Sequence, residues 1–244
     1  MSGHSKWATT KHKKGKIDAA RGKVFTKIAR EIIVAAKAGG GDPDANSRLR
    51  LALEKAKAAN MPNDNITRAI RRGTGESEGA VYEEMTYEGY GPGGTAIMLD
   101  ITSDNRNRTA GEIRHIFSRN NGNLGEIGCV AWMFSRKGMI ILNGESIDED
   151  ELMLTALDAG ADDVTVEDGS AEIITEPDSL EEVKNALAEN YTIESAEITM
   201  LPQNTIALEG DTAEKMLKLL DLLEEHDDVQ AVYTNADFPD ELLD

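Results

Sequence analysis

Apolar residues recur every three or four positions in three stretches of the first 75 residues, which is the spacing of one helix face. The first stretch covers residues 18–38, and its expected inner residues are Val24, Ile28, Ile32 and Ala35. The inner residues expected in the next two stretches are Leu49, Ala52, Leu53, Ala56, Ile66, Ala69 and Ile70. Three helices joined by short loops predict a small helical bundle.

Polar residues beside these stretches predict where each helix begins. Asp18 is the expected N-cap of the first helix, which the glycines at 39–41 end. Asp42-Pro43-Asp44 is expected to start the second helix, because acids and proline favour the first helical turn. Asn63 or Asp64 is expected to cap the third helix.

After residue 80 the pattern changes to a period of two, which predicts strands at 80–87 and 95–102. A helix is expected to end near Asn120, with Asp104 or Asn105 as its N-cap. Residues 130–135 are expected to form a further strand.

From residue 137 the pattern predicts the order strand, helix, two strands, helix, strand, which is the ferredoxin-like arrangement. The expected strands are 139–142, 164–166, 171–175 and 193–200. The expected helices are 148–159, with Leu152, Leu154 and Leu157 on its apolar side, and 180–190. A final strand, helix and strand are expected at 205–208, 212–225 and 229–233.

The sequence therefore predicts an α+β multidomain protein. We expect an N-terminal basic arm and three-helix bundle over 1–75 and a discontinuous α+β middle domain formed by 80–136 and 203–238. A ferredoxin-like βαββαβ domain over 137–202 is expected as an insertion in that middle domain.

The N-terminal part of the chain is basic and the C-terminal part is acidic. The first 75 residues hold 17 lysines and arginines against six acids, although the whole chain has a formal net charge of −19. Residues 138–244 hold three basic and 30 acidic side chains. A surface this acidic repels nucleic acid, so we expect nucleic-acid contact only at the basic head, and a possible protein partner at the acidic C-terminal domains.

The basic residues of the head predict a polyanion-binding surface, either on DNA or on ribosomal RNA or transfer RNA. In residues 1–17, Trp7 is expected to stack on a base or to pack on the bundle. The alternative is a solvated tail without a ligand. The residues expected to bind nucleic acid are Lys6, Trp7, Lys11, Lys13, Lys14, Lys16, Arg21, Lys23, Lys27, Arg30, Arg68, Arg71 and Arg72.

Catalytic chemistry has little support in the sequence. Residues 89–94 match G-x-G-x-x-G, but a strand-like segment follows them and Pro92 lacks an amide donor, so we expect a hairpin loop. Cys129 has no identifiable base, and the four histidines lack a second metal ligand at a suitable spacing. We therefore expect a non-enzyme without metal or cofactor.

The composition also predicts the cellular compartment of the protein. One cysteine, no run of 18 apolar residues and no apolar signal segment favour the cytoplasm and exclude an internal disulfide. We expect a monomer.

Several motifs make the chain resemble the YebC family over essentially its whole length. They include Gly3-His4-Ser5-Lys6-Trp7, Lys11-His12-Lys13-Lys14, Asn60-Met61-Pro62, Arg72-Gly73-Thr74-Gly75, Tyr87-Glu88-Gly89-Tyr90-Gly91-Pro92-Gly93-Gly94 and Asp104-Asn105-Arg106-Asn107-Arg108-Thr109. Cys129 departs from the serine or alanine expected there, which argues against a catalytic cysteine. The resemblance implies a helical head, a middle α+β domain and an inserted ferredoxin-like domain.

Three functional hypotheses follow, two implied by the resemblance and one by the glycine-rich motif. The first is a DNA-binding transcriptional regulator, the label that most members of the family carry. The second is a translation factor bound to ribosomal or transfer RNA, because the family includes a mitochondrial translational activator and bacterial relatives linked to ribosome stalling. An enzyme built on the glycine-rich loop is the least favoured.

Overall fold

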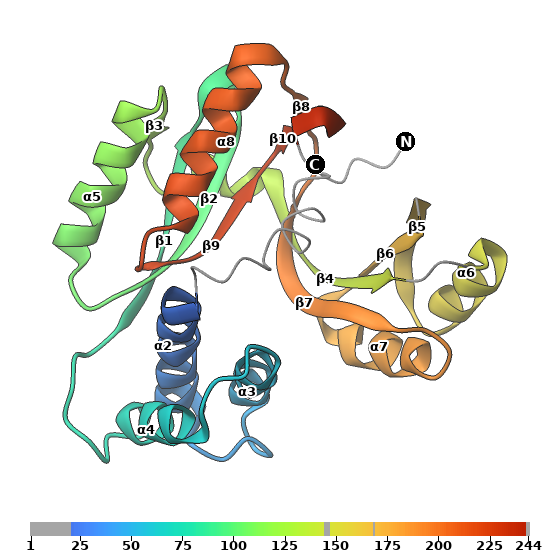
Figure 1. Ribbon diagram of the computed structural model, residues 1–244, viewed down its shortest axis with the longest axis horizontal. Coiled ribbons are helices and arrows are strands. Elements are labelled where there is room, and N and C mark those ends of the chain that lie inside the picture. The colour runs from blue at the N-terminus through green and yellow to red at the C-terminus, as the bar shows by residue number, and fades with distance from the viewer. Residues whose placement is uncertain (1–20, 144–146, 168, 243–244) are drawn as a thin grey trace. The chain divides into compact units, whose positions relative to one another are not determined.

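The computed structural model describes residues 21–143, 147–167 and 169–242 (Figure 1). They fall into two compact units, one within 16–130 and 210–232 and the other within 131–209 and 233–244. Three helices near the start of the described residues, two four-stranded β-sheets and one two-stranded sheet confirm the predicted multidomain α+β fold. The predicted domain boundaries stay a prediction.

The first unit begins with three helices, α2 (Arg21–Gly39), α3 (Ser47–Ala58) and α4 (Asn63–Gly73), which pack on one another. Their shared core contains Ile28, Ile32, Ala35, Leu49, Ala52, Ala56 and Ala69. Val24 was expected in this core but is 38% exposed, and its neighbour Phe25 packs against the core instead.

The expected start of the second helix was wrong. Asn46, and not residues 42–44, is the N-cap of α3, and its side chain accepts a hydrogen bond from Leu49 N at 3.1 Å. The same side chain donates to the carbonyls of Ala35 and Gly40 at 2.8 and 2.9 Å. This buried asparagine therefore fixes the end of α2 to the start of α3.

The expected cap of the third helix was also wrong. Pro62 occupies the N-cap position of α4 without a side-chain hydrogen bond, and both Asn63 and Asp64 lie inside the helix. The carbonyl of Pro62 accepts the first backbone bonds of the helix, from Asn65 N and Ile66 N. Asp64 is still in the first turn, where a carboxylate favours the positive helix end.

The middle sheet contains β1 (Glu83–Tyr90), β2 (Ala96–Ser103), β3 (Asn123–Leu124) and β9 (Val229–Thr234) in the order β3-β1-β2-β9. Helices α5 (Arg106–Arg119) and α8 (Gly210–Glu224) contact each other beside the sheet, as Figure 1 shows. Asn105 caps α5 as predicted, and its side chain accepts from Arg108 N at 3.1 Å.

The glycine-rich segment is the predicted hairpin loop. Strands β1 and β2 pair antiparallel on either side of it, and the loop contains the short 3-10 turn η2 (Pro92–Gly94). Gly93 and Gly94 both have φ of 75°, which favours glycine. The amides of Gly91 and Gly94 donate to Thr95 O and Gly91 O. The loop uses these donors internally, so they are not directed at a phosphate.

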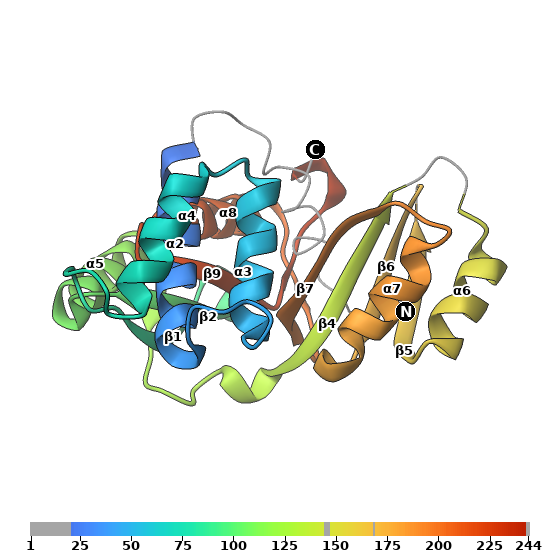
Figure 2. The same cartoon turned by 90° about the horizontal axis from the view of Figure 1, so that it is seen from below.

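The second sheet contains β4 (Phe134–Asn143), β5 (Ala161–Glu167), β6 (Ser170–Thr175) and β7 (Ile193–Pro202). Its antiparallel order β5-β6-β4-β7, with α6 (Glu149–Asp158) and α7 (Leu180–Ala188) after its first and third strands, confirms the ferredoxin-like arrangement. Both helices pack on the face that carries Ile140 and Leu142 (Figure 2). The 3-10 turn η4 (Pro177–Ser179) precedes α7.

Two strand and helix details differ from the predictions. Residues 131–133 form the 3-10 turn η3 (Ala131–Met133) instead of a strand, and β4 is one strand of ten residues that begins at Phe134. In α6, Leu152 is buried, but Leu154 and Leu157 are 66% and 47% exposed. Ala156, one turn after Leu152, provides the second buried contact.

The chain ends with short elements. Strands β8 (Ile206–Ala207) and β10 (Ala236–Asp237) pair in parallel, and the 3-10 turn η5 (Asp240–Leu242) follows. Among the described residues, no helix is both long enough and apolar enough to cross a membrane.

Candidate nucleic-acid interface

The predicted binding residues divide into an arm and a helical set. Lys6, Trp7, Lys11, Lys13, Lys14 and Lys16 lie outside the described residues, so their role stays a prediction. Arg21 is the first residue of α2. The remaining six residues lie on α2 and α4, and their surroundings differ.

Three basic residues of α2 contact the C-terminal end of α8 and the residues after it. Lys23 Nζ donates to Glu225 O at 3.2 Å, and Lys27 Nζ donates to Glu224 O at 2.6 Å. Arg30 donates to the backbone carbonyl of Asp227. Cations are favoured at the negative end of a helix, so these three side chains stabilise the junction between the head and the middle sheet. The sequence pattern alone placed them on a free outer surface.

Arg30 also binds Asp228, a carboxylate with a relative exposure of only 2%. Its Nη1 lies 2.7 Å from Oδ1, and Arg108 Nη2 lies 2.8 Å from Oδ2. Thr109 Oγ1 donates to Oδ2 at 2.5 Å. Burial alone would raise the pKa of Asp228, but the hydrogen bonds from Thr109 and Arg108 and the charge of Arg30 outweigh it and lower this pKa to about 2.

Arg72 is held against the segment that leads into β1. Its guanidinium lies 5.2 Å from the ring centre of Tyr82, and Arg30 lies at the same distance. Arg72 Nη2 also donates to Ala80 O at 3.2 Å. Two arginines against one aromatic ring stabilise the junction through cation–π contacts. Both guanidinium groups therefore have structural contacts inside this unit.

Four exposed cations of the helical head have neither an ion pair nor a side-chain hydrogen bond with any of the described residues. They are Arg50, Lys57, Arg68 and Arg71. Other cations of the head are paired, Arg48 with Glu84 and Lys55 with Glu31. Arg68 and Arg71 were predicted as binding residues, but Arg50 and Lys57 were not. Arg48 and Lys55 are exposed on the same helix, so Arg50 and Lys57 differ from them in lacking an acidic partner among the described residues and not in exposure.

A cavity of about 430 Å³ lies between α2 and α4, next to the unpaired Arg68. Its apolar lining includes Phe25, Ala29, Ile33 and Met61, and the charged lining residues are Arg68, Arg72 and Glu78. An aromatic ring beside an arginine is the combination on which nucleic-acid bases stack. The cavity places this combination beside Arg68, one of the four unpaired cations.

A second basic element was missed by the sequence reasoning. Helix α5 carries four arginines and one histidine but only one acid, Glu112. The count of charges over the whole acidic body concealed this helix. A count over single elements would have detected it.

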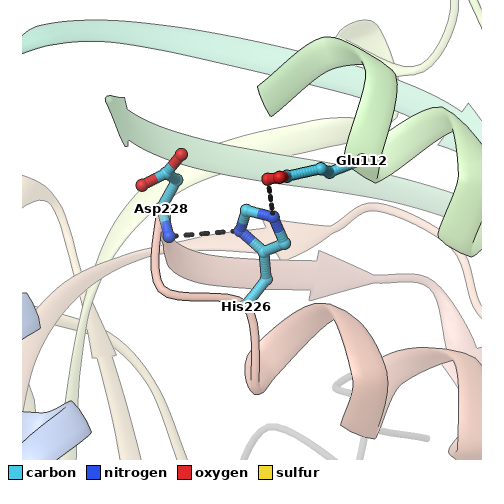
Figure 3. A group of neighbouring side chains, drawn as sticks. All are labelled: Glu112, His226 and Asp228. Atoms are coloured by element: carbon cyan, nitrogen blue, oxygen red, sulfur yellow. Dashed lines mark hydrogen bonds and ion pairs between the residues drawn. The ribbon is translucent and has the colours of Figure 1, made fainter. Parts of the chain in front are cut away.

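Glu112, His226 and Asp228 are a possible metal-ligand group, because their candidate ligand atoms lie within 4.8 Å of one another (Figure 3). The backbone N–H of Asp228 donates to His226 Nδ1 at 3.1 Å, so the proton is on Nε2, which lies 3.0 Å from Glu112 Oε2. Both carboxylate oxygens of Asp228 already accept from arginine and hydroxyl donors. We interpret the group as a hydrogen-bond network and not as a metal site.

Cys129 lies in a loop that the buried Glu88 holds. The carboxylate of Glu88 accepts from Gly128 N at 2.7 Å and from Val130 N at 2.8 Å. Burial and the negative charge of Glu88 raise the pKa of the Cys129 thiol. A raised pKa lowers the thiolate fraction, so this cysteine does not have the environment of a nucleophile.

Comparison with known proteins decides the family. The family model of the "TACO1/YebC protein N-terminal domain" matches residues 5–76. The model of the "TACO1/YebC second and third domain" matches residues 82–236. This chain belongs to the TACO1/YebC family.

Curated relatives of this YebC-family chain are similar over nearly their full length. A protein of Pelotomaculum thermopropionicum is 61% identical over 98% of this chain and 100% of its own length, and one of Syntrophobacter fumaroxidans is 61% identical over 100% and 99%. Both are named probable transcriptional regulatory protein. The crystal structure of a conserved hypothetical protein of Aquifex aeolicus is 50% identical, with a TM-score of 0.87 over 98% of this chain and 100% of that one.

Proposed function

We propose that this YebC-family chain is a non-enzymatic, DNA-binding transcriptional regulatory protein of the cytoplasm, and that its basic head binds the DNA. The observation that carries the proposal is the set of exposed cations with neither an ion pair nor a side-chain hydrogen bond among the described residues, Arg50, Lys57, Arg68 and Arg71. Unpaired cations on a helical surface are suited to phosphates. The names of the curated relatives support a regulatory role.

The head is suited to hold such a surface rigidly. Its apolar core and the buried Asn46 fix the three helices to one another. Since Arg72 is held by Tyr82 and Ala80, Arg68 and Arg71 are the arginines of α4 with freedom to reach DNA. The acidic residues 138–244 repel phosphate and so favour an orientation in which the head faces the DNA.

Salt-dependent binding to duplex DNA tests the proposal. Arg68→Ala and Arg71→Ala, separately and together, should weaken binding and reduce the slope of log K against log salt by about 1 per arginine. Lys215→Ala removes the same charge from α8, where Lys215 pairs with Asp211, and should leave the slope unchanged. Fluorescence anisotropy of a labelled duplex measures both quantities. Slopes equal to that of the unmodified chain would contradict a role for α4.

Cross-linking in cells separates DNA from RNA as the target. The protein is recovered, and both the attached DNA and the attached RNA are sequenced. Enrichment of promoter DNA is expected. Recovery of ribosomal or transfer RNA without promoter DNA would overturn the proposal in favour of a translation factor.

A further inference from the structure

The outer face of α5 is an exposed basic surface outside the helical head. Residues spaced by three or four positions form this face, and all of them are exposed: Asn107, Gly111, Arg114, His115 and Ser118. Arg106 and Arg119 are exposed at the two ends of the helix. The face itself contains no acid. Glu112, the single acid of the helix, contacts His226 at 3.0 Å and Arg108 at 3.9 Å.

The charges at the start of α5 are unfavourable for an isolated helix. Its first turn carries Arg106 and Arg108 and no acid, although the positive end of a helix favours anions. Asp104 and Asp228 neutralise Arg108. Arg106 has no ion pair among the described residues, so an external anion would improve the electrostatics of this helix end.

Gly111 is the second, independent observation. It lies in the middle of α5, and a Cβ added there would meet no atom within 4 Å. Glycine in a helix interior costs about 0.5–1 kcal/mol relative to alanine, and here no packing contact requires it. The absence of a side chain leaves the helix backbone open to close approach from outside, between Asn107 and His115.

One buried carboxylate links the start of α5 to the head. Arg30 of α2 and Arg108 of α5 bind the two oxygens of Asp228 at 2.7 and 2.8 Å. The basic helix of the head and the basic helix of the middle sheet therefore meet at this residue. From Arg106 to Arg119 the helix extends about 20 Å, which corresponds to roughly six phosphates of one DNA strand.

We propose that the outer face of α5 binds the sugar–phosphate backbone of the DNA that the head binds, with Gly111 at the point of closest approach. Arg106, Arg114 and Arg119 contact phosphates, and Asn107 donates a hydrogen bond to one of them. This inference rests on the proposed function, and it extends the DNA contact from the head onto the middle sheet.

Substitutions at Gly111 test the close approach without a change of charge. In the full chain, Gly111→Ala should raise the melting temperature slightly, and Gly111→Leu should leave it at or above that of the unmodified chain, because the site has open space. Affinity for a duplex should fall with side-chain size, to about tenfold weaker for Gly111→Leu. Asn185→Leu, at an exposed position of α7, is the matched control and should bind like the unmodified chain.

Charge reversal tests the electrostatic part. Arg114→Glu should weaken duplex binding about tenfold or more and flatten its salt dependence. Lys184→Glu, on α7 of the acidic sheet, makes the same charge change and should have little effect. If Gly111→Leu and Arg114→Glu both bind like the unmodified chain while the α4 variants bind weakly, the inference on α5 is wrong and the proposed function stands. If the unmodified chain binds no duplex, both are wrong.

Discussion

Asp228 is the residue that joins the most distant parts of the first unit. Arg30, Ser103, Arg108 and Thr109 all donate to its carboxylate, which is nearly fully buried. These donors come from α2, the end of β2 and the start of α5. A buried carboxylate is stable only with such donors, so the group depends on the folded arrangement of three elements.

Replacement of Asp228 tests this role. Asp228→Asn should lower the free energy of unfolding by about 3 kcal/mol, because Arg30 and Arg108 would lose a buried anionic partner. Urea-induced unfolding at pH 7 measures the loss. Asp211→Asn, whose carboxylate is 77% exposed beside Lys215, is the control and should change the value by less than about 0.5 kcal/mol. Equal effects of the two variants would contradict the role of Asp228.

The same residue predicts a dependence of stability on pH. The folded-state pKa is about 2 and the ordinary value is 3.8, so the carboxylate contributes about 2 kcal/mol when the pH is above 4. This contribution is lost as the pH falls from about 4 to 2. Urea midpoints between pH 2 and 5 should therefore fall more steeply with acid for the unmodified chain than for Asp228→Asn.

Helix α6 shows how an element decides which of its apolar residues are buried. Leu152, Leu154 and Leu157 are all leucines of one helix, but the sheet covers only the side that carries Leu152 and Ala156. Residues four positions apart share a face, whereas Leu154 is turned by about half a revolution from Leu152. The helix is therefore amphipathic with two leucines outside its buried stripe.

Two alanine substitutions in α6 test this assignment. Leu152→Ala should cost about 3 kcal/mol, because it leaves a cavity in the core of the ferredoxin-like sheet. Leu154→Ala removes the same atoms from an exposed position and should change stability by less than about 0.5 kcal/mol. Thermal unfolding followed by circular dichroism compares them directly. A large loss for Leu154→Ala would mean that the exposed leucine has a contact in solution.

The charge distribution of the whole molecule predicts a long-range effect on association with DNA. Glu182→Gln on α7, combined with Glu189→Gln directly after this helix, makes the net charge of −19 less negative by two. Association should become about twofold faster at about 0.01 M salt, where the screening length is ~30 Å, and should not change at 0.15 M. Stopped-flow fluorescence measures both rates. An equal increase at the two salt concentrations would indicate a local contact instead of long-range repulsion.

The hydrophobic periodicity was sufficient to predict the type and order of most helices and strands, but not where each of them begins and ends. It predicted the ferredoxin-like order, since each strand and helix there has its own period. It failed at residues 130–135, because an apolar run alone does not distinguish a strand from a turn. It also missed Asn46 as a cap, since acids and a proline precede it at 42–44 and favoured an earlier start.

The sequence by itself determined the separation of charge between a basic head and an acidic C-terminal half, the mixed α+β class and the family motifs. Only the tertiary structure decided which cations are available to a ligand. Lys23, Lys27 and Arg30 contact the end of α8 and Asp228, whereas Arg68 and Arg71 have no such partners among the described residues. The physical reason is that a cation's partner can lie 202 residues away in the chain, as for Lys23 and Glu225, and no local sequence pattern predicts such a contact.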